Sequence, residues 1–131
     1  MDDATKAKVD AVIANVIQSA ARLADAKARE MELDGQRSQV KSEAIARIMS
    51  IEDPQKGKPY SATAAAEIVM NDVVFAMHES DRRNATADTI RVAGEYEAAK
   101  LAARFAVSGA EIEGFEPLRV ALQLDHTVRM N

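Results

Sequence analysis

Two long, alanine-rich stretches with a helical pattern, separated by one short loop, are the feature that most constrains this chain. The loop spans residues 51–61 and contains Pro54, Gly57 and Pro59. Proline and glycine clustered in this way interrupt a helix and favour turns. The sequence therefore predicts an all-α protein in which two long helices pack on each other, or on a partner, as a helical hairpin or coiled-coil-like bundle.

The first stretch, residues 3–49, carries apolar residues at alternating steps of four and three, namely Val9, Ile13, Val16, Ala20 and Leu23. Heptad spacing of this kind places the side chains on one helix face and is typical of coiled-coil contacts. This apolar seam packs either within the hairpin or against another chain. We expect a dimer that forms through Val9, Ile13, Val16 and Leu23.

Two interruptions leave alternatives open. Gly35 lies in a charged stretch of the first helix and is either a tolerated kink or a break into two helices, of which one long helix is expected. The second stretch, residues 62–108, follows a plausible N-cap at Ser61, and its polar residues 80–84 form either a turn or the exposed part of a continuous helix. Ser108 and Gly109 predict its end.

The short C-terminal element, residues 110–131, permits two interpretations. Pro117 suits the first position of a short helix. The alternation of Leu118, Val120 and Leu122 with other residues is instead typical of a strand. We expect a helix over residues 118–128, because a lone strand needs a pairing edge from elsewhere. The whole chain has the length of a single domain.

Composition limits the function. The chain has 131 residues, 26 alanines, no cysteine and a net charge of −4. The missing cysteines exclude disulfides and thiolate sites and favour the cytoplasm, where small domains do without such cross-links. The acidic balance disfavours general nucleic-acid binding, which depends on neutralising phosphates. No apolar run approaches the ~18 residues needed to span a membrane, so no membrane association is expected.

Motifs for catalysis and metal binding are incomplete. His78 and Glu79 begin the zinc-protease helix motif, but Arg82 occupies the position of the second histidine. Neither His78 nor His126 has a glutamate three residues earlier, as a di-metal helix bundle requires. We therefore expect no metal, no cofactor and no enzymatic activity.

Three groups of residues are candidates for contact with a partner. The loop offers Lys56, Lys58 and Tyr60, and a tyrosine gives large contact area at low entropy cost. Tyr60 has an alternative structural role, in which it packs onto the next helix near Ala65. The other two groups are the basic pair Arg82 and Arg83 and the acidic face around Glu30, Glu32 and Asp34.

Two segments, KSEAIARIMSIEDPQKGKPYSATAAAEIV and GEYEAAKLAARFAV, resemble small helical accessory proteins of tailed phages and prophages. The resemblance covers about residues 38–107. It implies a protein of the bacterial cytoplasm that inhibits a host defence system, such as a CRISPR effector, by occluding a surface. The alternative that it implies is an accessory protein of phage recombination or replication that contacts nucleic acid. It supplies no catalytic residue.

Overall fold

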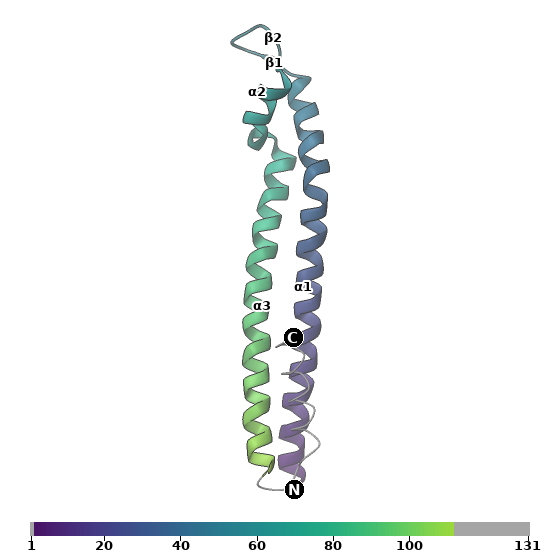
Figure 1. The fold of residues 1–131 in the computed structure, drawn as a ribbon, viewed down its shortest axis with the longest axis vertical. Coiled ribbons are helices and arrows are strands. Elements are labelled where there is room, and N and C mark those ends of the chain that lie inside the picture. Colours follow the sequence, from purple (N-terminus) through teal and green to yellow (C-terminus); the bar gives the residue numbers. More distant parts are fainter. Residues whose placement is uncertain (1, 112–131) are drawn as a thin grey trace. The chain divides into compact units, whose positions relative to one another are not determined.

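The computed structural model describes residues 2–111, and almost all of them are helical. The elements follow in the order α1 (Asp3–Met49), β1 (Glu52–Asp53), β2 (Lys58–Pro59), α2 (Ala62–Glu67), a 3₁₀ turn η1 (Val69–Asn71) and α3 (Val73–Glu111). α1 packs against α3 as a long helical hairpin (Figure 1), so the predicted all-α fold is confirmed. The expected C-terminal helix, residues 118–128, lies outside the described residues.

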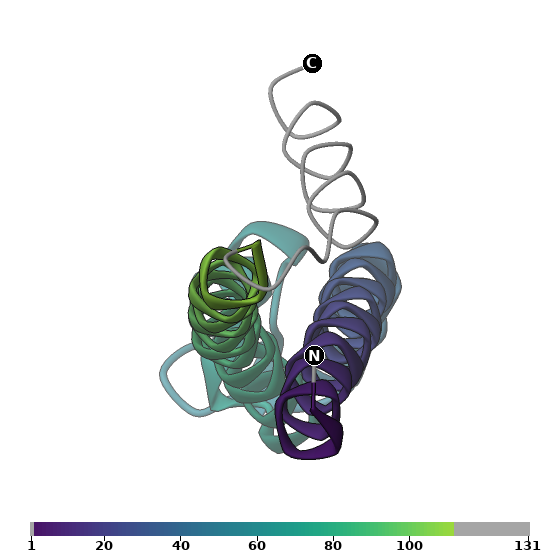
Figure 2. The same ribbon diagram turned by 90° about the horizontal axis from the view of Figure 1, so that it is seen from below.

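The chain divides into two compact units, and the division falls inside both long helices. Unit 1 comprises Met1–Asp25 and Ile90–Asn131, and unit 2 comprises Ala26–Thr89. Within each unit, a part of α1 lies beside a part of α3, as the two views in Figure 1 and Figure 2 agree. No helix among residues 2–111 is both long enough and apolar enough to cross a membrane.

The first helix has the predicted bounds. Asp2 caps it, since the backbone N–H of Thr5 donates to its carboxylate at 2.7 Å. That hydrogen bond lowers the pKa of Asp2. The helix continues through Gly35 without a break, which resolves the first alternative in favour of one long helix.

A two-residue antiparallel β-hairpin forms inside the loop, where Glu52 pairs with Pro59 and Asp53 pairs with Lys58. Asp53 organises the turn: its carbonyl accepts from the N–H of Gly57 and its carboxylate from the N–H of Gln55, both at 2.9 Å. Gly57 has a positive φ of 65°, which a residue with a side chain rarely adopts. The loop therefore has a fixed turn at its tip.

The second helical stretch breaks near residues 68–72, and residues 80–84 lie inside α3, so of the two alternatives for residues 80–84 the structure has the continuous helix. Ser61 caps α2 as predicted, through its hydroxyl and the N–H of Ala64 at 3.1 Å. A new cap follows at Asp72, whose carboxylate accepts from the N–H of Phe75 at 2.9 Å. An aspartate directly before an apolar run is a helix-start signal, and the sequence analysis missed it.

The end of α3 also differs from the prediction. The helix continues past Ser108 and Gly109 to Glu111. The hydroxyl of Ser108 donates to the carbonyl of Arg104 at 3.1 Å, which is a bond formed inside a continuing helix. Gly109 therefore lies within the last turn of α3 instead of stopping it.

The buried faces of both long helices follow a nearly unbroken heptad pattern. On α1 the heptad series of buried or half-buried positions is Val9, Val12, Val16, Ser19, Leu23, Ala26, Glu30, Leu33, Arg37, Val40, Ala44 and Ile48, and the half-buried residues beside it are Thr5, Ile13, Ala20, Lys41 and Ile45. On α3 the series is Phe75, His78, Arg82, Ala85, Thr89, Val92, Tyr96, Ala99, Ala103 and Val107, and the buried or half-buried residues beside it are Ala76, Glu79, Ser80, Ala93, Lys100 and Ala106. Steps of three and four keep one face turned to the neighbouring helix. Small and polar residues occupy many of these positions, so the core is narrow.

Each unit has its own apolar cluster. In unit 2, the cluster consists of Ala44, Ile48, Ala65, Val69 and Phe75, with Tyr60 and Ile68 packed against it. In unit 1, Val9 and Val107 are buried together, with Ile13 and Ala106 beside them. The larger cluster lies where α2 covers the ends of α1 and α3, because a third element adds apolar surface there.

Candidate interaction surface

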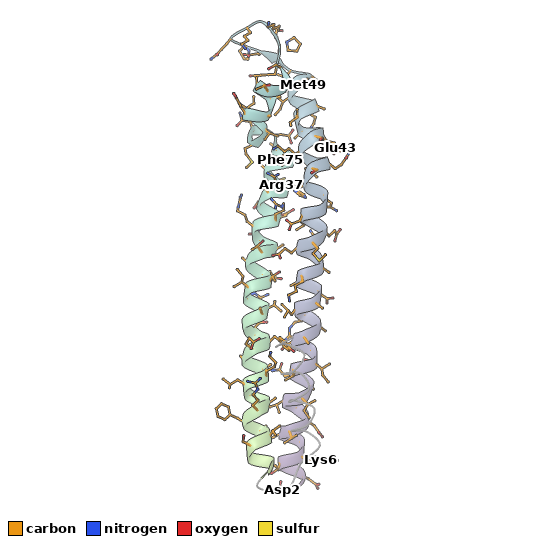
Figure 3. All side chains as sticks on the ribbon, in the orientation of Figure 1. Asp2, Lys6, Arg37, Glu43, Met49 and Phe75 are labelled. Carbon is orange, nitrogen blue, oxygen red and sulfur yellow. The ribbon has the colours of Figure 1, made fainter. Side chains whose placement is uncertain are left out.

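Ion pairs between α1 and α3 engage several of the predicted contact residues in unit 2. The guanidinium of Arg82 contacts Asp34 at 2.9 Å and Glu79 at 3.1 Å. Arg37 donates to Glu79 at 2.9 Å and its guanidinium lies over the ring of Phe75, 5.7 Å from the ring centre. Figure 3 shows Arg37 and Phe75 next to each other between the two helices. Arg82 and Asp34 therefore form an ion pair that links α1 to α3 within unit 2.

The pKa values in this network follow from its geometry. Burial acts to raise the pKa of Glu79, but the hydrogen bonds from Arg82 and Arg37 outweigh it and the net shift is downward. The hydrogen bond to Asp34 raises the pKa of Arg82, and the one to Glu79 adds to it. Glu79 and Arg82 are consequently both charged at neutral pH.

The remaining charged candidates lie at different places on unit 2. Arg83 is exposed and, with Thr86 and Arg82, borders a small depression of about 230 Å³. Glu30 is half-buried at a seam position of α1. Glu32 is exposed and stays on its own helix, 3.8 Å from Arg29. The three residues of the predicted acidic face therefore do not form one surface. Glu30 faces α3, Asp34 pairs with Arg82, and only Glu32 is an exposed carboxylate without a contact to α3 among the described residues.

The loop residues separate by role. Lys56 and Lys58 are exposed at the tip of the β-hairpin. Tyr60 is half-buried and packs against the apolar cluster that contains Ala65. The structural alternative for Tyr60 therefore describes its position, and only the two lysines are fully available to a partner.

A groove in unit 2 was not visible in the sequence. Its volume is about 430 Å³, and its lining is mainly apolar. Ile51, Val73 and Val74 line it with 56%, 70% and 55% of their surfaces exposed. These residues come from the loop and from the start of α3, so no single helical pattern in the sequence groups them.

A bidentate ion pair borders this groove. Arg47 donates to both carboxylate oxygens of Asp72, each at 2.8 Å. The bonds from Arg47 and from the N–H of Phe75 lower the pKa of Asp72 from 3.8 to about 2. The pair joins the end of α1 to the first turn of α3, and it fixes the two sides of the groove at that point.

In unit 1, the seam predicted for self-association lies inside the hairpin. Val9 is buried against Val107, Ile13 packs beside them, and Val16 and Leu23 are half-buried. The large apolar residues exposed in this unit are instead Ile17, Ile90, Leu101 and Phe105. A dimer would need a surface other than the predicted seam, because that seam is already occupied within the chain.

Two titratable side chains of α3, Lys100 and His78, are buried. Lys100 is buried in unit 1, with its ammonium 3.1 Å from Glu97 and 4.4 Å from the centre of the Tyr96 ring. His78 is buried in unit 2, and neither of its ring nitrogens has a hydrogen-bond partner among residues 2–111. Within the described residues, no group of three or more histidines and carboxylates is close enough to hold a metal ion.

Comparison of the chain with protein-family profiles, with curated proteins and with solved structures finds no match. We therefore classify the protein from its own structure alone. It is an all-α protein whose two long helices pack on each other, form ion pairs and leave apolar residues exposed.

Proposed function

We propose that this chain is a non-enzymatic protein–protein interaction protein that docks a partner on the groove of unit 2. The observation that supports this function is the exposure of Ile51, Val73 and Val74 around one mainly apolar groove. Exposed apolar residues that gather in one place, bordered by polar groups, are typical of interaction sites. Single scattered apolar residues would carry no such meaning.

The chemistry of the groove suits an apolar side chain of the partner. Its walls are aliphatic, Tyr60 contributes an aromatic face, and the Arg47–Asp72 pair supplies polar groups at the border. Binding energy at interfaces concentrates in such apolar pockets with a polar surround. Met77 lies one helical turn after Val73 and is also exposed, so the apolar surface extends along α3.

The biological role that we propose follows from the resemblance to phage accessory proteins. A protein of that kind would act in the cytoplasm of a bacterial host and inhibit a defence protein by covering a surface that it needs. Occlusion requires a firm docking surface and no catalytic group. The bidentate ion pair and the buried cluster behind the groove favour such firmness.

The test compares two variants as baits in a pull-down from bacterial lysate, with quantitative mass spectrometry. Val73→Asp with Val74→Asp places charge on the groove, at the start of α3 where negative charge favours the helix. Met31→Asp is the matched control, because Met31 is 73% exposed in the same unit but does not line the groove. We expect a partner that the wild type and the control capture and that the groove variant loses.

Equal capture by all three baits would remove the groove as the docking site. Capture by none of them would contradict the proposed function in the host tested. Circular dichroism of each variant confirms that the helices are retained.

A further inference from the structure

The outward face of α3 in unit 1 carries a second heptad seam. Its positions are Gly94, Ala98, Leu101 and Phe105, at steps of four, three and four. All four are exposed, with 53% of Leu101 and 71% of Phe105 accessible. The first seam of this part of α3, with Val92, Ala99 and Ala103, already faces α1. The second seam therefore has the spacing of a helix contact but no helix of unit 1 against it among the described residues.

We propose that this second seam binds the same seam of another copy of the chain, with the two α3 helices antiparallel about a two-fold axis. The axis passes between positions 98 and 101. Such a contact is isologous, so each pair of facing residues occurs twice. This surface is separate from the groove of unit 2, and the proposal does not depend on the function proposed for that groove.

The sizes of the side chains support the antiparallel arrangement. Gly94 of one copy faces Phe105 of the other, and Ala98 faces Leu101, so a small residue meets a large one in every layer. A parallel pair would instead place Gly94 against Gly94 and Phe105 against Phe105. That arrangement leaves a gap at one end of the seam and crowds the other.

Gly94 supplies an independent argument. A glycine in a helix interior costs about 1 kcal/mol relative to alanine. A Cβ added at Gly94 would meet nothing within 4 Å among residues 2–111, so the described part of one copy does not need a glycine there. Opposite Phe105 of a second copy, the missing side chain provides room for the ring.

The charged residues beside the second seam also favour the antiparallel dimer. Glu97 and Arg104 flank the seam on the same side, one heptad apart, and both are exposed. In an antiparallel pair of helices, flanking positions of this type face each other, so Glu97 of each copy lies opposite Arg104 of the other. A parallel pair would instead place Glu97 opposite Ala102 and Arg104 opposite Gly109, so neither residue would meet an opposite charge.

The size of the surface sets the expected affinity. A stable interface buries about 800 Å² on each partner, and four seam positions on one helix provide less than that. We therefore expect a dissociation constant on the order of tens of micromolar for the full chain. Analytical ultracentrifugation from about 5 µM to about 500 µM, a range chosen to span that constant, measures it directly.

The decisive experiment uses two charge-reversal variants. Glu97→Arg and Arg104→Glu each place like charges opposite each other in a dimer of identical chains, so each should weaken association by about tenfold. Mixing the two variants restores both opposite-charge pairs, and the mixture should associate as the wild type does. Glu97→Arg also removes the carboxylate 3.1 Å from the buried ammonium of Lys100, so only variants that keep the melting temperature of the wild type enter the mixing experiment.

Two further variants test the seam itself. Leu101→Glu should abolish the dimer, whereas Ile17→Glu, which changes a residue of α1 that is 64% exposed, should not. Gly94→Leu should keep or raise the melting temperature, because the helix gains a better helix former in open space, and yet should weaken the dimer by at least about tenfold.

Several results would overturn the proposal. These are a monomeric wild type at the highest concentration, a mixture that does not recover association, or a Gly94→Leu variant that dimerises normally. The proposal would also fail if Leu101→Glu lowered the melting temperature but left the mass measured by ultracentrifugation equal to that of the wild type. That result would mean that residues 112–131 of the same chain cover this face instead.

Discussion

At the scale of single residues, Asp72 contributes most to the geometry of the candidate groove. Its carboxylate caps α3 through the N–H of Phe75 and also receives both hydrogen bonds from Arg47. Only the ionised carboxylate can accept all of these bonds, which is why the pKa of Asp72 falls to about 2. One side chain therefore defines where α3 starts and how the end of α1 is held.

We predict an acid-dependent loss of stability that Asp72 controls. In the unfolded chain its pKa returns to about 3.9, so the unfolded state binds more protons between about pH 4 and pH 2. The stabilisation is complete above about pH 4 and is lost as the pH falls through about 2. Urea unfolding at pH 7 and at pH 3 measures the resulting difference in the free energy of unfolding.

Two substitutions separate the roles of Asp72. Asp72→Asn keeps a good capping residue but removes the charge, so its stability should depend less on pH between 4 and 2 than that of the wild type. Asp72→Ala also removes the cap and should cost about 1 kcal/mol more at pH 7. An equal acid dependence in wild type and Asp72→Asn would show that other carboxylates dominate.

Among the helices and turns, the features that the sequence predicted correctly are those that depend on neighbouring residues alone. The bounds of α1, the cap at Ser61 and the turn around Gly57 all follow from short-range rules, and the structure has each of them. The break at residues 68–72 was not predicted, and a turn at residues 80–84 stayed open as an alternative because these residues are polar for a long-range reason. Arg82 binds Asp34, which lies 48 residues away, and no window of the sequence displays that pairing.

The lack of long-range information in the sequence also explains why the buried positions of α1 were predicted only in part. The sequence pattern selected Ala20, but the buried neighbour is Ser19, because steps of three and four can be continued from Val9 in more than one register. The charged stretch from residue 25 to 37 looked like an interruption. In the structure Glu30 and Arg37 occupy seam positions, and Arg37 is satisfied by Glu79 and the ring of Phe75.

We predict unequal effects within the cross-helix ion pairs. Glu79 is only 14% exposed and accepts from both Arg37 and Arg82, so Glu79→Gln should cost about 1–2 kcal/mol. Asp34 is 56% exposed, and Asp34→Asn should cost less than about 0.5 kcal/mol. Thermal unfolding of both variants at low and high salt compares them. Equal costs would mean that Glu79 is better solvated than its position indicates.

At the scale of the whole molecule, the candidate site was only partly predictable. Charge and loop position identified Lys56 and Lys58, and both are exposed. The groove was not predictable, because it combines the end of α1, the loop, the residue after α2 and the start of α3. Exposed apolar residues such as Val73 and Val74 look like core residues in a sequence, since only the folded chain shows which of them remain uncovered.

The last prediction concerns nucleic acid, the alternative partner suggested by Lys56, Lys58, Arg82 and Arg83. The chain has a net charge of −4, and the guanidinium of Arg82 is already bound by Asp34 and Glu79. Of these four candidate cations, Arg82 is therefore already engaged, and the net negative charge opposes the phosphate contacts on which such binding depends. We expect no saturable binding of a fluorescent duplex at about 10 µM protein and about 150 mM salt, a condition under which non-specific binders are typically weak.

Fluorescence anisotropy with duplex DNA and single-stranded RNA, titrated from about 50 mM to 200 mM salt, measures this. The informative variant is Lys56→Glu with Lys58→Glu, because both lysines are exposed at the hairpin tip and neither forms an ion pair within the described residues. Binding that weakens steeply with salt and disappears in this variant would favour the nucleic-acid accessory function. Equal binding by the wild type and the double variant would instead place the phosphate contacts elsewhere on the chain. Compared with no binding, or with binding that the variant loses, this is the outcome we expect least, because the chain has a net negative charge.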